Sequence, residues 1–316
     1  MIDRPLHVEV RDLKRFYGKT RAVDGISFAF ESGHVFGFVG PNGAGKTTTL
    51  RVLATLDEPT DGDAFLNGVS VREDPEVVRT MVGFVPDSLP THSDITVLEY
   101  LDFFARAYGL GGRERTAAVE GVVEFTRLQG LRDKLIKSLS KGMKQRVSLG
   151  RALIHDPAVL LMDEPAAGLD PRARIEFREL VAALAEAGKA ILISSHILSE
   201  LTEICNGVVI IDKGKVLETG TMEEVRTRDR TRFRRALAIR PLDRHEEMRR
   251  DLLETPRVEQ VGLVGAELRV EIEGSDEECC AILAGLVQLG YRIVEFRPCR
   301  DDLEDVFMRI TGKETE

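Results

Sequence analysis

GPNGAGKTTT, residues 40–49, fits the phosphate-binding loop pattern G-x-x-x-x-G-K-[ST] from Gly40 to Thr47. The preceding run HVFGFV, residues 34–39, is apolar, β-prone and bounded by glycines, so it predicts a buried strand. The following run, TTTLRVLATL from residue 47, favours a helix. Because strand, glycine loop and helix occur in the order that the motif requires, the stretch predicts a nucleoside triphosphate site in an α/β, P-loop fold.

The residue types of this loop suit a chain of phosphates. Backbone N–H groups ahead of a helix N-terminus supply unpaired donors and the positive end of the helix dipole, and glycines let the backbone wrap closely. We expect Lys46 to contact the β- and γ-phosphate oxygens, Thr47 to ligate Mg²⁺ and Thr48 to reach an α/β oxygen. The predicted loop contacts are Gly40, Pro41, Asn42, Gly43, Ala44, Gly45, Lys46, Thr47 and Thr48.

The length and composition predict two globular domains. A chain of 316 residues, 43% hydrophobic and 31% charged, can form one domain of about 200 residues and one of about 80 to 100. Residues 1–225 are expected to form the domain that holds the phosphate loop. A charge-rich stretch, residues 226–236, is expected to be a linker to a smaller α+β domain at 237–316.

Composition also indicates where the chain is located and which classes of partner it can bind. The sequence has no apolar run of about 18 residues and no signal-peptide core at its start, so we expect a cytosolic chain that does not itself span a membrane. A net charge of −9 disfavours nucleic acid and anionic lipid as partners. Any association with a membrane is therefore expected to occur through a protein partner.

The four cysteines, Cys205, Cys279, Cys280 and Cys299, show no C-x-x-C spacing. This arrangement favours reduced packing residues over a metal or redox site.

The strands around the loop are predicted from alternation and turn residues. Residues 6–13 and 22–30 alternate apolar and polar side chains, which predicts two strands across a loop that holds Phe16, Tyr17 and Gly18. Asn67-Gly68 between apolar residues predicts a hairpin. Residues 1 to about 75 are therefore expected to form a mixed sheet with an antiparallel edge.

A helical insert is predicted between residues 90 and about 150. Thr96 and Glu99 form a capping-box pattern, residues 114–128 favour a second helix, and Ser140 is expected to cap a third helix. The insert has no heptad repeat that would indicate a coiled coil.

Polar side chains follow two further buried strands. AVLLMDEP, residues 158–165, ends in Asp163 and Glu164, and AILISSH, residues 190–196, ends in His196. Continuous apolar runs are typical of parallel strands buried on both faces, and ligands bind at the carboxyl ends of such strands. We therefore expect these three side chains to converge with the loop after Gly40 on one phosphate. Asp170-Pro171 then predicts the start of a helix.

The C-terminal region predicts a strand-helix-strand-strand-helix-strand order followed by a short helix near the end of the chain. This order is typical of a ferredoxin-like fold. No catalytic constellation is evident in its sequence.

Residues 6 to about 222 resemble the nucleotide-binding subunits of ABC transporters, with the family's motifs in their usual order. The loop at 40–47 resembles Walker A, LLMDE at 160–164 resembles Walker B, LSKGM at 139–143 resembles the LSGGQ signature, and GLDP at 168–171 is similar to the D-loop. The resemblance implies that Asp163 holds Mg²⁺, Glu164 polarises the attacking water, His196 contacts the γ-phosphate, and Tyr17 stacks on adenine. With Lys46, Glu164 and His196 are the expected catalytic residues.

Two departures from the family pattern affect the expected site. Asp87 stands where the family usually has the glutamine of its Q-loop, and an aspartate can ligate Mg²⁺ but cannot donate an amide hydrogen bond. The expected metal ligands are therefore Thr47, Asp163 and Asp87. In the signature, Lys141 and Met143 replace a glycine and a glutamine.

The resemblance implies a head-to-tail dimer in which each signature helix completes the phosphate site of the other subunit. The residues expected to act in trans are Ser140, Gly142, Met143 and Asp170. Two such ATPase subunits, identical or different, would close on ATP and open after hydrolysis.

The expected function is that of an ATP- and Mg²⁺-dependent subunit on the cytoplasmic face of the cell membrane, driving a separate integral membrane permease. The ending DLEDVFMRITGKE, residues 302–314, resembles ATPases that serve ABC-2-type permeases, which implies export. Two alternatives remain: a soluble ABC ATPase that acts on nucleic acid or ribosomes, and a non-hydrolysing regulatory subunit. The first is disfavoured because the chain has no coiled-coil insertion, second ATPase copy or basic balance of charge.

Overall fold

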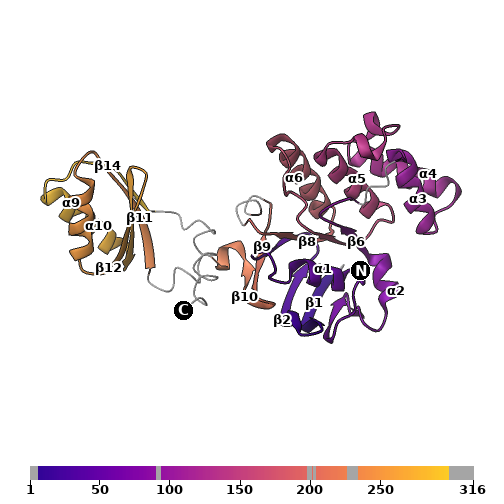
Figure 1. Cartoon of the computed structure of the whole chain (residues 1–316), viewed down its shortest axis with the longest axis horizontal. Coiled ribbons are helices and arrows are strands. Elements are labelled where there is room, and N and C mark those ends of the chain that lie inside the picture. The colour runs from indigo at the N-terminus through magenta and orange to yellow at the C-terminus, as the bar shows by residue number, and fades with distance from the viewer. Residues whose placement is uncertain (1–5, 90–93, 198–200, 202–203, 226–233, 299–316) are drawn as a thin grey trace. The chain divides into compact units, whose positions relative to one another are not determined.

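Two units follow one another along the chain, Met1–Met222 and Glu223–Glu316 (Figure 1). The computed structural model describes residues 6–89, 94–197, 201, 204–225 and 234–298. Most of the predicted linker, residues 226–233, lies outside that part, and its last three residues belong to strand β11. The predicted boundary at residue 225 lies three residues beyond the end of the first unit.

A six-stranded mixed sheet forms the centre of the first unit. Its strand order is β10-β9-β3-β8-β7-β6. The strands are β3 (Val35–Val39), β6 (Val82–Val85), β7 (Val159–Met162), β8 (Ala190–Ser195), β9 (Gly207–Asp212) and β10 (Lys215–Thr221). All neighbours run parallel except β10, which is antiparallel to β9. Every residue of β7 and β8 is buried, as their continuous apolar runs predicted.

A second, antiparallel sheet has the strand order β2-β1-β4-β5. Its strands are β1 (His7–Tyr17), β2 (Thr20–Glu31), β4 (Asp61–Leu66) and β5 (Val69–Ser70). The sequence predicted one sheet for this region, but β3 pairs with β8 and β9 instead, because its buried parallel run needs partners on both sides.

The turns of the antiparallel sheet differ from the prediction at one end and match it at the other. Phe16 and Tyr17 were predicted on a loop, but they end β1, where they pair with Arg21 and Thr20. The predicted hairpin at Asn67-Gly68 is confirmed, with φ of 52° and 86° at these residues, the left-handed values that such a two-residue turn requires.

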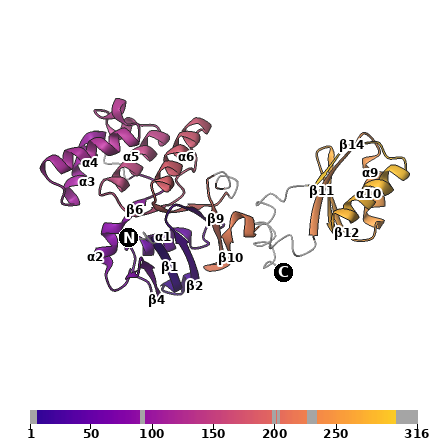
Figure 2. The same ribbon diagram turned by 180° about the vertical axis from the view of Figure 1, so that it is seen from behind.

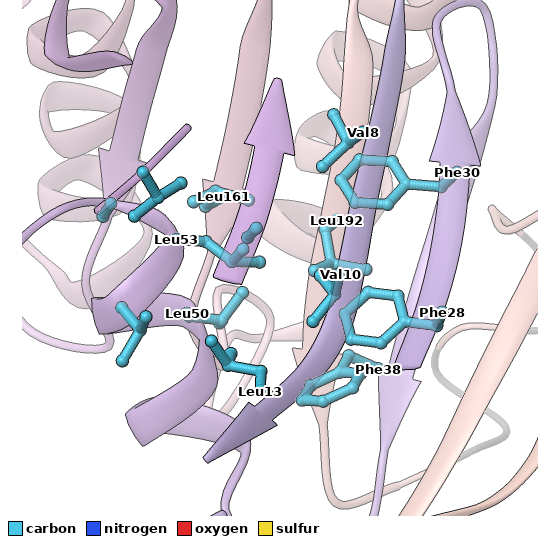
Figure 3. Close-up of a cluster of buried hydrophobic side chains, with 14 of the residues drawn as sticks. Val8, Val10, Leu13, Phe28, Phe30, Phe38, Leu50, Leu53, Leu161 and Leu192 are labelled. Atoms are coloured by element: carbon cyan, nitrogen blue, oxygen red, sulfur yellow. The ribbon is translucent and has the colours of Figure 1, made fainter. Parts of the chain in front are cut away.

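The hydrophobic core of the first unit joins both sheets to helix α1 (Lys46–Leu53). Figure 3 shows Phe28 and Phe30 of β2 beside Phe38 of β3, with Leu50 and Leu53 of α1 close by. Leu161 of β7 and Leu192 of β8 line the same cluster. The helix that follows the phosphate loop is therefore packed between the two sheets, which fixes the position of the loop.

Most helices of the first unit lie on the other side of the six-stranded sheet, as Figures 1 and 2 show. They are α3 (Val97–Ala107), α4 (Gly112–Phe125), α5 (Lys141–Leu153) and α6 (Pro171–Glu186), with short 3₁₀ turns at Gln129–Leu131 and Ile136–Ser138. The predicted capping box is confirmed: Oγ1 of Thr96 accepts from the backbone N–H of Glu99, and the Glu99 carboxylate accepts from that of Thr96. Helix α2 (Pro75–Met81) was not predicted.

The open edge of strand β6 is contacted by side chains of the segment that contains α5. Nη2 of Arg151 donates a 2.6 Å hydrogen bond to the carbonyl of Phe84, and Nε2 of His155 lies 3.1 Å from the carbonyl of Val82. The His155 ring also stacks on Tyr108, with ring centroids 3.8 Å apart. These contacts join the helical insert to the strand that leads to Asp87.

The second unit is a four-stranded antiparallel sheet of order β12-β13-β11-β14. Its elements are β11 (Arg234–Pro241), α9 (His245–Glu254), β12 (Val258–Val264), β13 (Glu267–Glu273), α10 (Asp276–Gln288) and β14 (Ile293–Pro298). The predicted order of strands and helices is confirmed up to Pro298, and the predicted short helix after it lies outside the described residues. The assignment of this unit to the ferredoxin-like folds stays a prediction.

The burial of the cysteines supports the predicted packing role for two of them. Cys205 and Cys279 are buried, Cys280 is exposed, and Cys299 lies outside the described residues. Burial raises the pKa of the Cys205 thiol, so this side chain stays protonated. Among the described residues, no helix combines the length and the apolar character needed to cross a bilayer.

Candidate functional site

The loop between β3 and α1 follows a path that glycine makes possible. Gly43 and Gly45 have φ of 83° and 106°, in the left-handed region that favours glycine. A Cβ on Gly40 would lie 2.2 Å from the carbonyl oxygen of Ile211, and a Cβ on Gly45 would lie 2.4 Å from that of Ala22. The loop is thus held tightly between β9 and β2.

Lys46, the first residue of α1, is buried, with a side chain only 5% exposed. Its Nζ donates to the carbonyl oxygens of Gly40 at 2.7 Å and Pro41 at 3.2 Å. The ammonium therefore lies within the curve of the phosphate loop.

Three of the predicted catalytic and metal-binding side chains follow the ends of β7 and β8. Asp163, 5% exposed, accepts a 2.7 Å hydrogen bond at Oδ1 from the hydroxyl of Ser194. Oε2 of Glu164 lies 2.8 Å from Nδ1 of His196, and Oε1 of Glu164 lies 3.4 Å from Nζ of Lys46. Glu164 therefore bridges a cation of the phosphate loop and an imidazole of the neighbouring strand.

These groups line one cleft of ≈ 780 Å³, a volume in the range of small-ligand sites. The predicted site residues that line it are Tyr17, Asn42, Gly43, Gly45, Lys46, Thr47, Thr48, Asp87, Asp163, Glu164 and His196. Gly40, Pro41 and Ala44 shape the loop without lining the cleft. The same cleft is also lined by Arg21 and Lys213, two cations for which the sequence motifs gave no signal.

Tyr17 lies at the rim of the cleft and is 43% exposed. Its hydroxyl donates a 2.5 Å hydrogen bond to Asp57, and the guanidinium carbon of Arg15 lies 4.5 Å from the centre of its ring. Burial alone would raise the pKa of Asp57, but the Tyr17 hydroxyl and the charges of Arg15 and Arg51 outweigh it and lower that pKa. Asp57 thus stays ionised and holds the tyrosine in place.

The residues predicted to act in trans lie in a different pocket, of ≈ 290 Å³. Ser140, Gly142, Met143 and Asp170 all line it. The Ser140 hydroxyl caps α5 by accepting from the backbone N–H of Met143 at 3.3 Å, and Asp170 caps α6 by accepting from that of Ala173 at 2.9 Å. A Cβ on Gly142 would lie 2.8 Å from the Cβ of Ala173, so this glycine permits the close approach of the two helix starts.

Known proteins resemble this chain over most of its length. The model of the ABC transporter family matches residues 23–167. The Nod factor export ATP-binding protein I of Cupriavidus metallidurans is 35% identical over 307 residues, covering 97% of this chain and 98% of the relative. Its counterpart in Paraburkholderia xenovorans is 36% identical over 315 residues, covering 98% of each.

Solved structures give the same result for the fold. An ATP-binding subunit of an ABC transporter is 31% identical, with a TM-score of 0.64, and covers 70% of this chain and 92% of that structure. CbiO1 of Clostridium perfringens, described as part of an ABC transporter complex, is 26% identical, with a TM-score of 0.65, over 80% of this chain and 97% of that one. The chain therefore belongs to the ABC transporter family, as an ATP-binding subunit with ATPase activity.

Proposed function

We propose that the chain hydrolyses ATP with Mg²⁺ at the cleft around Lys46, and that it powers export by a separate membrane permease. The observation that carries this proposal is the bridge of Glu164 between Lys46 and His196, with Asp163 in the same cleft. A site for ATP binding alone would not need the partly buried carboxylate of Glu164 at this position, because withdrawing a charge from water is costly unless it is paired or used.

The oxygen donors of the cleft fit Mg²⁺. Thr47, Asp163 and Asp87 all line it, and Mg²⁺ in NTP sites is held by one or two carboxylates together with the phosphates and water. Among the described residues, no three His, Cys, Asp or Glu side chains are grouped to hold a metal ion by themselves. We infer that the ion is bound together with the nucleotide, and that it neutralises charge on the phosphates.

The other residues act on the nucleotide and the attacking water. Lys46 and the backbone of the loop bind the phosphates, and Tyr17 stacks on adenine. Glu164 accepts a proton from the water that attacks the γ-phosphate, and His196 orients that water and contacts the γ-phosphate. The 2.8 Å contact between Glu164 and His196 supports this pairing of roles.

We further propose a head-to-tail dimer. Ser140, Gly142, Met143 and Asp170 line a pocket distinct from the cleft, so within the first unit the signature helix does not serve the chain's own phosphate loop. In a two-fold dimer each signature pocket would meet the cleft of the other subunit, and both sites would become complete together.

Export is proposed from the relatives. Two relatives that match over nearly their whole length are Nod factor export ATP-binding proteins. The partner would be an integral membrane permease of the ABC-2 type, and the chain would bind to the cytoplasmic face of the membrane through it. The permease, rather than this chain, would select the cargo.

The test compares the wild type with Glu164→Gln. The wild type is expected to release phosphate from ATP only with Mg²⁺, whereas Glu164→Gln binds ATP, loses hydrolysis and accumulates as a dimer in light scattering. Wild-type chain added to detergent-solubilised membranes is expected to recover a polytopic membrane protein. Recovery of ribosomes or DNA alone, or equal phosphate release by both proteins, would refute the proposal.

A further inference from the structure

Ser194 is a buried polar residue that contacts both acidic residues at the end of β7. It lies in β8, and its side chain is fully buried, with 0% exposure. Its hydroxyl donates a 2.7 Å hydrogen bond to Oδ1 of Asp163 and accepts a 2.9 Å hydrogen bond from the backbone N–H of Glu164. The hydroxyl thereby uses its single donor and one of its acceptor sites on two consecutive residues of the cleft.

Glu164 needs such support because its backbone is strained. Its φ is 47°, in the left-handed region that a residue with a Cβ occupies only at a cost. The bond from its N–H to Ser194 ties this turn to the neighbouring strand. The same turn aims the Glu164 carboxylate at His196 and Lys46.

We propose that Ser194 is a positioning residue for ATP hydrolysis: it fixes one oxygen of the Asp163 carboxylate for the metal and holds the turn that aims Glu164 at the attacking water. This inference rests on the roles proposed above for Asp163 and Glu164. Ser194 itself is fully buried and is not among the residues that line the cleft. It acts through the two carboxylates, as residues that orient metal ligands commonly do.

Removal of the Ser194 hydroxyl should therefore change the Mg²⁺ dependence and the kcat of ATP hydrolysis but not the affinity for the nucleotide. In Ser194→Ala, Asp163 can rotate away from the orientation that suits the metal, and Glu164 loses the bond that holds its turn. Loss of such an orienting partner typically costs about 10- to 100-fold in metal affinity or activity. The phosphate loop and Tyr17 are untouched, so the KM for ATP should change little.

The experiment measures ATPase rates of the full chain against Mg²⁺ concentration at saturating ATP, and against ATP at saturating Mg²⁺. Independently of turnover, electron paramagnetic resonance measures the affinity of the ADP-bound chain for Mn²⁺, which Ser194→Ala is expected to lower. Ser194→Ala is expected to raise the half-saturating Mg²⁺ concentration and lower kcat by about 10-fold or more. Ser194→Thr keeps the hydroxyl and should lie near the wild type. Ser148→Ala is the matched control, because Ser148 is also 0% exposed and its hydroxyl has no hydrogen-bond partner among the described residues.

Thermal unfolding of each variant shows whether it is folded at the assay temperature. If Ser194→Ala does not fold, Ser194→Cys, which keeps a side chain of similar size but only a weak donor, replaces it in the same titrations. Wild-type kcat and Mg²⁺ dependence in the folded variant would overturn the proposal, as would a folded Ser194→Thr that behaves like Ser194→Ala. If Glu164→Gln loses ATPase activity while Ser194→Ala keeps the wild-type kcat and Mg²⁺ dependence, the proposed function is supported and only the role of Ser194 is refuted.

Discussion

Lys46 and Glu164 form an ion pair across the cleft, with Nζ 3.4 Å from Oε1 and side chains that are 5% and 16% exposed. The pair connects the phosphate loop to the end of β7. Because Lys46 is the single cation of the loop at residues 40–49 and is buried, we expect Lys46→Ala to weaken ATP binding by about 10- to 100-fold, the range of a charge-assisted hydrogen bond. Equilibrium binding of a fluorescent ATP analogue measures this change. Lys215→Ala, at an exposed lysine of β10, is the control and should bind normally.

His196 is expected to affect turnover rather than binding. Its Nδ1 lies 2.8 Å from Glu164, and in the proposed mechanism it helps to orient the attacking water. We expect His196→Ala to lower kcat by about 10²- to 10⁴-fold, with a small change in KM. Steady-state phosphate release gives both constants, and His34→Ala, at an exposed histidine before β3, should match the wild type. A raised KM with normal kcat would assign His196 to binding instead.

Tyr17 is expected to recognise the base and not the phosphates. Loss of base stacking in Tyr17→Ala should cost about 1–3 kcal/mol, roughly 5- to 150-fold in ATP affinity. Inorganic tripolyphosphate, which has no base, should bind Tyr17→Ala and the wild type equally. Tyr17→Phe keeps the ring but loses the 2.5 Å hydrogen bond to Asp57, so its ATP affinity should lie between that of the wild type and that of Tyr17→Ala. Equal losses for ATP and tripolyphosphate would contradict the stacking role.

The proposed dimer predicts complementation between two inactive chains. Lys46→Ala damages the cleft and Ser140→Arg damages the signature pocket, so a mixed dimer contains one intact composite site. A 1:1 mixture should recover up to about one quarter of the wild-type ATPase rate, because half of the dimers are mixed and each has one working site of two. A mixture of Lys46→Ala with Glu164→Gln is the control. Both changes then lie in the cleft, so no intact site forms and no activity should return.

His155 should make folding sensitive to acid. Burial disfavours its charged form and lowers its pKa below the usual value, despite its bond to the Val82 carbonyl. The neutral ring therefore contributes stability above a pH of about 6.5, and this contribution is lost as the pH falls, because the unfolded state binds the proton more readily.

The measurement is the melting temperature at several pH values. The melting temperature of the wild type should fall more steeply between pH of about 7 and about 5 than that of His155→Gln, since both share every other titrating group. His34→Gln, at an exposed position, should follow the wild-type slope. Parallel slopes for His155→Gln and the wild type would remove His155 as the source.

The sequence predicted those site residues that follow directly from a strand or a helix start. Lys46, Asp163, Glu164 and His196 come after buried apolar runs, and parallel strands bring their carboxyl ends to one edge, so spacing alone placed them together. Ser194 was not predicted, because it is an interior residue of β8 and only the three-dimensional register of β8 against β7 brings its hydroxyl to Asp163.

Two further residues and one helix were missed or misplaced because the local sequence carries little signal for them. No sequence motif marked Asp57, and its contact with Tyr17 spans 40 residues of sequence. Tyr17 itself was placed on a loop because alternation weakens toward the end of β1, whereas pairing with Thr20 extends the strand through it. Helix α2 has seven residues, too few for a helical period to stand out.

The contacts of Arg151 and His155 with strand β6 also bear on how the protein avoids self-association. β6 is the last strand at one end of the six-stranded sheet, and an exposed sheet edge is a template on which another chain can add a strand and begin to aggregate. Here the outward carbonyls of Val82 and Phe84 are already engaged by side chains of the same molecule. Two backbone acceptors of this edge are thereby unavailable to a foreign strand, and loss of both contacts is expected to favour aggregation.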